Sequence, residues 1–86
     1  MNGIGSLLDT VVKQRPRCTA LSWGEQDMTY SELDVAVDRL AARLAATVRP
    51  GQRVAIVAPN VPALVVGLFA VWRVGAVAVP INARSR

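Results

Sequence analysis

Residues 53–60 read Arg53-Val-Ala-Ile-Val-Ala-Pro-Asn60, and residues 76–80 read Ala76-Val-Ala-Val-Pro80. Unbroken apolar runs of this length are typical of parallel strands that are buried on both faces. They predict strands over Val54–Ala58 and Ala76–Val79. Between them, Pro62–Val74 is apolar nearly all round and predicts a buried helix. Parallel strands need a long crossover, which this helix supplies, so the stretch predicts one βαβ unit.

Two glycines mark this crossover. Gly67 lies inside the predicted helix, where glycine costs about 1 kcal/mol relative to alanine. We therefore expect another element to approach the helix closely there. Gly75 follows the helix, at the position where a left-handed residue usually ends it.

The chain before this unit begins with a predicted helix over residues 6–14. Ser6 is a suitable N-cap, Asp9 is a weak capping-box partner three residues later, and Pro16 ends the helix. Leu7, Leu8, Val11 and Val12 form its apolar face.

A short hairpin is predicted next. Thr19–Trp23 alternates in polarity and predicts a strand, residues 24–27 predict a turn, and the residues around Met28 predict a return strand. Together these elements indicate an α/β fold: an incomplete parallel-sheet βαβ layer with an N-terminal helix and a short hairpin, all within one unit, residues 1–86.

A second helix is predicted from Tyr30 to about Val48. Thr29 and Glu32 match a capping box, in which each side chain accepts a hydrogen bond from the other residue's backbone N–H. Arg49-Pro50-Gly51 stops the helix. Its apolar stripe recurs at steps of three and four residues and consists of Leu33, Val37, Leu40, Leu44 and Val48.

Charge and cysteine usage exclude several classes of protein. The net charge is +4, but the basic residues are scattered and the aromatics few, so nucleic-acid binding is not expected. The absence of histidine excludes His-based catalysis or metal ligation by this chain. A single cysteine, Cys18, excludes an internal disulfide and predicts a reducing, cytoplasmic location.

The composition is unusually apolar for so small a chain, with 52% of residues in the hydrophobic set. We infer that apolar surface is buried by a partner, either the remainder of a larger domain or a second chain. A membrane span is not expected, because Arg73 interrupts the apolar run after Trp72. The first residues do not resemble a signal peptide.

Three polar residues follow the predicted strands and are candidates for ligand contact. Asn60 lies at the carboxyl end of the first strand, where open α/β sheets bind ligands, but it also suits a helix cap, which is the favoured interpretation. Asn82 and Arg84 follow the second strand, where they either face a cleft or form a solvated loop exit, and the loop exit is favoured.

Four further residues have both a functional and a structural interpretation. Cys18 is interpreted as a packing residue rather than a reactive thiol, since no histidine activates it. Glu32 is assigned to the capping box rather than to acid–base catalysis. Trp23 and Trp72 are interpreted as core or interface residues rather than stacking platforms.

Two blocks together resemble a known family. Met28-Thr-Tyr-Ser-Glu-Leu33, continued by Pro50-Gly-Gln-Arg-Val-Ala-Ile56 and Pro59-Asn60, resembles the opening of the adenylate-forming (AMP-binding) enzymes, acyl-CoA synthetases among them. Trp72-Arg-Val-Gly-Ala-Val-Ala-Val-Pro-Ile-Asn82 resembles their second block. One departure is Ala63, where the family often has an acidic residue, and it bears on the substrate subgroup.

The resemblance implies a ligase several hundred residues long. Such enzymes convert a carboxylic acid and Mg-ATP to an acyl-adenylate, and many then transfer the acyl group to the thiol of coenzyme A or a carrier protein. Fatty acid metabolism is the implied setting. The family's phosphate loop, nucleotide-binding motifs and catalytic lysine lie downstream of the matched part, and Gly3-Ile-Gly5 is no phosphate loop.

We therefore expect no catalytic, cofactor-binding or metal-binding residue within residues 1–86. ATP, Mg²⁺ and coenzyme A are implied for the full-length family only, and the chain alone is expected to be inactive. The alternative hypothesis is a small non-enzymatic α/β interaction module, or one half of a split enzyme.

Overall fold

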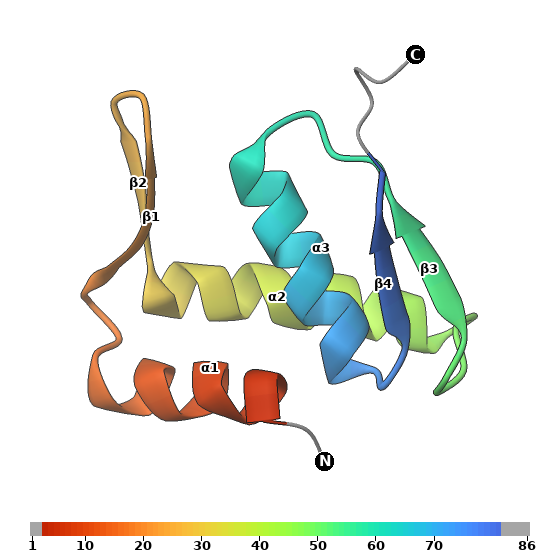
Figure 1. Ribbon diagram of the computed structural model, residues 1–86. Helices are drawn as coiled ribbons and strands as arrows, with labels where there is room; N and C mark the ends of the chain where they lie inside the picture. The colour runs from red at the N-terminus through yellow and green to blue at the C-terminus, as the bar shows by residue number, and fades with distance from the viewer. Residues whose placement is uncertain (1–2, 82–86) are drawn as a thin grey trace.

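The computed structural model describes residues 3–81, with side chains from residue 8 onward. The elements follow in the order α1 (Gly3–Gln14), β1 (Thr19–Trp23), β2 (Gln26–Thr29), α2 (Tyr30–Ala45), β3 (Arg53–Ile56), α3 (Val61–Arg73) and β4 (Val77–Pro80). Figure 1 shows α2 crossing the molecule, with α1 beside it, the β1–β2 hairpin projecting at one end and the β3–β4 pair at the other. The predicted α/β class and the order of the elements are confirmed.

The βαβ unit is formed as predicted. β3 and β4 are parallel neighbours, with Arg53 opposite Val77 and Ile56 opposite Pro80. α3 ends in the motif expected at Gly75, whose φ is +79°. The N–H of Gly75 donates to the carbonyl of Trp72, and the N–H of Ala76 donates to the carbonyl of Val71. Because Ala76 closes the helix in this way, β4 begins one residue later than predicted.

Burial on both faces of the sheet was predicted and is wrong for this chain. Residues alternate between exposed and half-buried along β3, and three of the four residues of β4 are exposed. Helix α3 packs on one face of the sheet, and no described element covers the other. β3 also ends at Ile56, two residues before the predicted end, and Pro59, which has no N–H to pair, follows soon after.

Gly67 is the site of close approach that the sequence predicted. A Cβ placed at Gly67 would lie 3.2 Å from the Cγ2 atom of Ile56 in β3. The absent side chain lets α3 lie closely against this strand, which accounts for a helix-weakening residue in mid-helix.

Helix α2 begins as predicted and ends earlier. The Glu32 N–H donates to Thr29 Oγ1 at 3.1 Å, and the Thr29 N–H donates to Glu32 Oε1 at 2.8 Å, which completes the capping box. The predicted end at Val48 is wrong, since α2 stops at Ala45. The N–H of Ala46 bonds to Arg43 and that of Thr47 to Leu44, so the last turn tightens to i→i−3 bonds before the Pro50 turn.

Helix α1 and strand β1 of the hairpin both pack against α2 and α3, and β2 packs against α2. α1 starts at Gly3, so the predicted N-cap at Ser6 is wrong, and the predicted face residue Leu7 lies outside the described side chains. β1 and β2 pair antiparallel as predicted, with an irregularity between Thr19 and Leu21.

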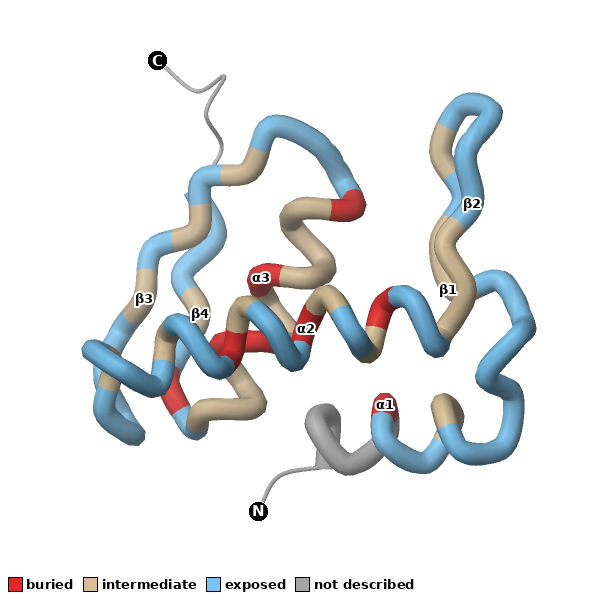
Figure 2. The backbone as a smooth tube through the Cα atoms, turned by 180° about the vertical axis from the view of Figure 1, so that it is seen from behind, coloured by how far each residue is buried: buried red, intermediate tan, exposed pale blue. Residues whose placement is uncertain are grey.

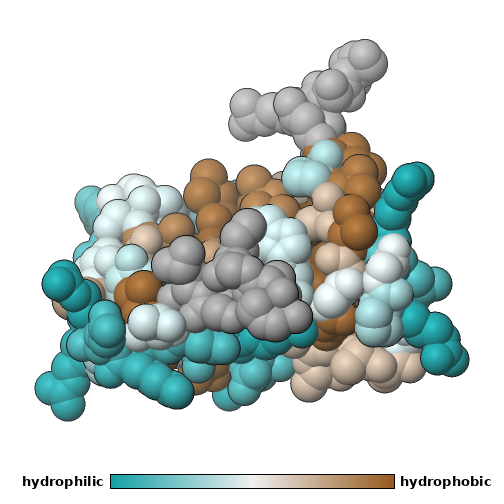
Figure 3. Space-filling view, turned by 60° about the horizontal axis from the view of Figure 1, so that its bottom comes forward, coloured by the Kyte–Doolittle hydropathy of each residue, from teal (hydrophilic) through white to brown (hydrophobic). Residues whose placement is uncertain are grey.

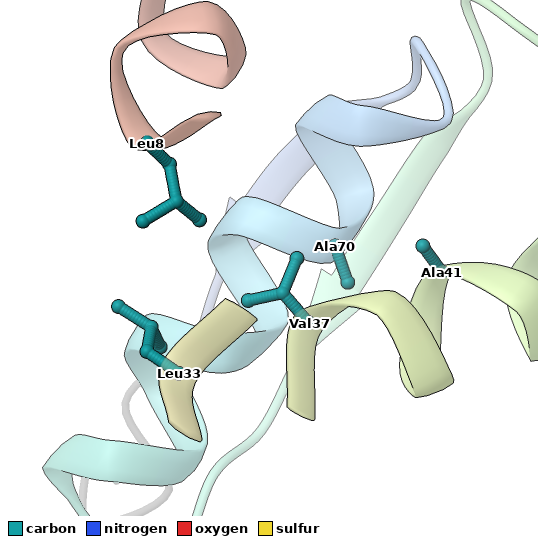
Figure 4. Close-up of a cluster of buried hydrophobic side chains, with 5 residues drawn as sticks. All are labelled: Leu8, Leu33, Val37, Ala41 and Ala70. Atoms are coloured by element: carbon teal, nitrogen blue, oxygen red, sulfur yellow. The ribbon is translucent and has the colours of Figure 1, made fainter. Parts of the chain in front are cut away.

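The core lies between the three helices. Leu8 of α1, Leu33, Val37 and Ala41 of α2, and Ala70 of α3 form one buried cluster. Figure 4 shows Leu8 extending from α1 toward Leu33 and Val37. In Figure 2 most of the buried stretches fall on α2 and α3, with one on α1, whereas β3 and β4 are mostly half-buried or exposed. Within residues 3–81 no helix is long and apolar enough to cross a bilayer.

Candidate functional site

The loop after β3 carries the first candidate residue, Asn60. Its Oδ1 atom accepts the Ala63 N–H at 3.0 Å, and Asn60 is the N-cap of α3, with Pro62 in the first turn. The structural interpretation is therefore confirmed, because the side-chain oxygen satisfies one of the unpaired N–H groups of the helix start. The other two candidates, Asn82 and Arg84, lie outside the described residues.

Two further sequence candidates have different outcomes. Glu32 is engaged in the capping box, as predicted. Cys18, in contrast, is exposed, so its predicted packing role is wrong. It lies in the turn between α1 and β1, where its carbonyl accepts the Tyr30 N–H at 3.0 Å. That bond uses only the backbone and leaves the thiol at the surface.

Trp23 and Trp72 are both half-buried, in agreement with a role as core or interface residues. Trp72 packs edge-on against Phe69, one turn earlier on α3, with ring centroids 5.4 Å apart and an interplanar angle of 84°. This T-shaped arrangement is the favoured geometry for an aromatic pair and orients Trp72 on the helix surface.

The only ion pairs among the described residues converge on one side chain, Arg73 at the end of α3. Its Nη2 atom lies 3.0 Å from Asp9 Oδ1 of α1 and 3.1 Å from Asp34 Oδ1 of α2. Its Nη1 atom lies 3.2 Å from Asp38 Oδ1, one turn further along α2. The Arg73 side chain as a whole is 21% exposed, and its contacts with Asp9 and Asp38 lie at the surface. It joins all three helices on one side of the core.

The arrangement is electrostatically specific. Asp34 and Asp38 are four residues apart on one helix face, where like charges repel. A guanidinium placed between them offsets this repulsion, and its planar fork of donors can bond several carboxylates at once. Three acids facing one base leave the cluster with a net negative charge, yet within the described part of the chain no group of acidic, Cys or His side chains is placed to hold a metal ion.

The sequence analysis treated Arg73 as an interruption of an apolar run and as part of the second family block, and it missed the ion pairs. The available signal was a lone charge in a helix that is otherwise apolar, since a partly buried charge requires partners. The partners themselves were beyond sequence reasoning, because Asp9 is 64 residues away in the chain.

Among the described residues, two apolar hollows open at the surface. The first, about 310 Å³ in volume, lies between α1, the hairpin, α2 and α3. Its lining consists of Leu8, Val11, Ala20, Leu21, Tyr30, Leu33, Val65 and Phe69. The second, about 280 Å³, lies between β3, α2 and α3 and is lined by aliphatic residues, glycine and proline. Both can bury apolar groups, and neither lining contains a carboxylate, an amine or a thiol.

Comparison with protein families gives one match over nearly the whole chain: the model described as AMP-binding enzyme matches residues 8–86. Among curated proteins, the feruloyl-CoA synthases of Amycolatopsis sp. and Streptomyces sp. are each 47% identical to this chain over 83 residues. The match covers 95% of this chain but only 17% of either synthase.

Solved structures agree with this match. The N-terminal subdomain of Klebsiella oxytoca NpsA superimposes with a TM-score of 0.91 at 30% identity, covering 100% of this chain and 23% of that one. The o-succinylbenzoate coenzyme A synthetase of Bacillus subtilis, solved in complex with AMP, gives a TM-score of 0.83 at 32% identity. That alignment covers 92% of this chain and 21% of the synthetase.

Proposed function

This chain belongs to the family of AMP-binding enzymes, and from that premise we propose that residues 1–86 are the N-terminal part of an ATP-dependent acid–thiol ligase. In the proposed reaction a carboxylate oxygen of the substrate attacks the α-phosphorus of ATP, and pyrophosphate leaves. The thiol sulfur of coenzyme A then attacks the acyl carbon, and AMP leaves. The observation that carries the proposal is the 47% identity to two feruloyl-CoA synthases over 83 residues.

The same relatives guide the choice of substrate. The family resemblance implied fatty acid metabolism, but feruloyl-CoA synthase is named for an aromatic acid, and we favour an aromatic acid and coenzyme A as the substrate pair. The NpsA subdomain has also been solved in complex with anthranilyl-AMSN and with 3-hydroxybenzoyl-AMSN, whose acyl groups are aromatic too. We further propose a cytoplasmic enzyme that binds no nucleic acid.

Within the ligase, the part played by residues 1–86 is structural. Asn60 and Glu32 are engaged as helix caps, and the carboxylates of Asp9, Asp34 and Asp38 hold Arg73. Asn60, the described polar residue that follows the carboxyl end of β3, is therefore already engaged, and these side chains do not fit a site for Mg²⁺ or for the phosphates of ATP. We propose that ATP, Mg²⁺ and coenzyme A are bound by residues outside this chain.

The test has two parts. The purified 86-residue chain, incubated with Mg-ATP and ferulate or a fatty acid, is expected to release no pyrophosphate. A chimera, in which this chain replaces the matching 83 residues of the Amycolatopsis feruloyl-CoA synthase, is expected to form feruloyl-CoA. The same synthase with that segment deleted is the control. Pyrophosphate release by the chain alone, or a folded chimera without activity, would contradict the proposal.

A further inference from the structure

Of the three helices, α1 is the most lightly anchored in its described part. Among residues 8–14 only Leu8 is buried, whereas α2 has three buried residues and α3 has four. Val12 packs against the core cluster but is half-buried. Asp9 pairs with Arg73 at 3.0 Å, and its side chain is 61% exposed. One buried leucine and one ion pair at the surface therefore account for much of the attachment of α1.

The chain is fixed to α2 directly after α1. The Ser31 N–H donates to the Pro16 carbonyl at 2.9 Å, and the Tyr30 N–H donates to the Cys18 carbonyl at 3.0 Å. These bonds satisfy N–H groups at the start of α2 that have no partner within their own helix. The described backbone bonds to α2 thus begin at Pro16, and α1 can move by backbone rotation at Arg15 and Pro16 without breaking them.

Arg73 keeps two carboxylates when α1 moves away. Asp34 and Asp38 of α2 lie 3.1 and 3.2 Å from its guanidinium, and neither belongs to α1. A partly buried cation without any partner is costly, but here the separation of Asp9 leaves the cation paired. Asp9 itself is already largely hydrated, so its release to water costs little. The Asp9–Arg73 ion pair can therefore break and form again without leaving a charge unpaired.

Helix α1 also forms one wall of the first apolar hollow. Leu8 and Val11 belong to α1, and the other lining residues come from β1, α2 and α3. Figure 1 shows α1 lying below α2 and joined to the rest of the chain at one end. An outward movement of α1 would remove this wall and expose the apolar side chains behind it.

We propose that α1 is a hinged lid over this hollow. It opens as a unit about Arg15–Pro16 while α2, α3 and both strand pairs stay folded, and the Asp9–Arg73 ion pair holds it closed. Because that ion pair lies at the surface, salt screens it and shifts the lid toward the open state. The lid is a property of the helices of this chain and is independent of the proposed ligase activity.

Amide hydrogen exchange on the 86-residue chain, resolved by residue with NMR, measures this opening. The amides of Val12 and Lys13 in α1 are expected to exchange at least about tenfold faster than those of Val37 and Ala70, with a weaker dependence on urea. A rise in NaCl from about 0.05 M to about 0.5 M should speed the α1 amides by about twofold or more and leave the Val37 amide unchanged.

A matched pair of variants separates the lid from general stability. Asp9→Asn and Asp38→Asn each remove one carboxylate from Arg73, the first on α1 and the second on α2. Asp9→Asn is expected to speed exchange at Val12 and Lys13 by about two- to fivefold, the range of an exposed ion pair, and to abolish the salt effect there. Asp38→Asn is expected to change these two amides by less than about 1.5-fold.

The chimera with the Amycolatopsis synthase provides a second measurement, by mass spectrometry of peptides, and decides the matter where the isolated chain does not fold. The same order of exchange is expected there. Three results would overturn the lid: exchange in α1 at the rate of Val37, which means that α1 opens only on global unfolding; an equal effect of Asp9→Asn and Asp38→Asn on α1; and no effect of Asp9→Asn on α1.

Discussion

The helical region and the β3–β4 sheet differ in how completely they are packed. Every member of the buried cluster comes from α1, α2 or α3, and the Arg73 ion pairs join the same three helices. The exposed large hydrophobic residues lie mostly in or beside the sheet: Val57, Val61, Val77, Val79 and Ile81, with Val35 of α2 as the exception. Figure 3 shows hydrophobic surface reaching solvent below the end of β4.

This difference shows that a clear local sequence pattern for an element does not mean that both faces of the element are packed within this chain. The βαβ unit has the clearest strand pattern in the chain, yet its sheet is covered on one face only. Parallel sheets are almost always covered on both faces. The helical region, with more ordinary amphipathic signals, closes around its own core. We therefore expect substitutions in the helical region to affect the stability of this chain strongly, and substitutions on the open sheet to affect it little.

The largest expected effect comes from a charge placed in the helical core. Val37→Asp puts a carboxylate at a position that is 0% exposed, with no partner. It is expected to cost about 4 kcal/mol or more, which approaches the whole stability expected of a domain of this size. Val35→Asp, on the same helix but 48% exposed, is the control and should change stability by less than about 0.5 kcal/mol. Urea unfolding followed by circular dichroism compares the two; equal midpoints would contradict the proposed position of the core.

A second prediction tests where the two regions meet. Gly67→Val should destabilise the chain by about 2 kcal/mol, because even a Cβ at this position lies 3.2 Å from Ile56 Cγ2. Ile56→Ala removes the obstructing atoms, so the double variant should be more stable than the sum of the two single effects predicts. A double-mutant cycle from urea unfolding measures this coupling. Strict additivity would mean that α3 does not press on β3 through these two residues.

The third prediction concerns the ion pairs that join the helices. Arg73→Gln removes the cation and leaves Asp34 and Asp38 facing each other. We expect the free energy of unfolding to fall by about 1–2 kcal/mol, and no more, because Asp9 and Asp38 are exposed to solvent. Arg73→Lys should recover only part of this, because an ammonium cannot bond with the same planar fork. Thermal melts at low and high salt test the effect, which should shrink as salt screens the charges.

Its control is Arg43→Gln, in the last turn of α2, since Arg43 has no ion-pair partner among the described residues. This variant should shift stability by less than about 0.5 kcal/mol. If it cost as much as Arg73→Gln, loss of general charge rather than the three-carboxylate contact would be responsible.

The elements of this fold were predictable because their signals are local. The Thr29–Glu32 capping box, the Asn60 cap and the Gly75 terminator each depend on residues within a few positions, and each is confirmed. The start of α1 was misplaced because Ser6 is a plausible cap inside a helix that begins at Gly3. The end of α2 was misplaced because Val48 fits the apolar stripe although the helix has already tightened at Ala46.

What sequence reasoning could not supply depends on long-range geometry. The partners of Arg73 come from two other helices, and no local spacing relates Asp9 to α3. The exposure of a strand also depends on which other elements pack against it. An apolar run such as Ala76–Val79 predicts burial, but among residues 3–81 no element covers one face of this sheet. The capping roles of Asn60 and Glu32, in contrast, were predictable, because both side chains bond to the backbone three residues away.

The smallest expected effect is on the open face of the sheet. Val77 is 48% exposed, so Val77→Thr, which keeps the β-branched shape, should change the stability of the 86-residue chain by less than about 0.5 kcal/mol. In the chimera with the feruloyl-CoA synthase the same substitution should cost about 1–2 kcal/mol, because a hydroxyl would then be buried without a partner. Thermal melts of both proteins, with Val35→Thr on α2 as the matched exposed control, make the comparison. An equally small shift in both proteins would mean that this face stays uncovered in the longer enzyme, and that the contrast between the two regions is a property of the fold itself.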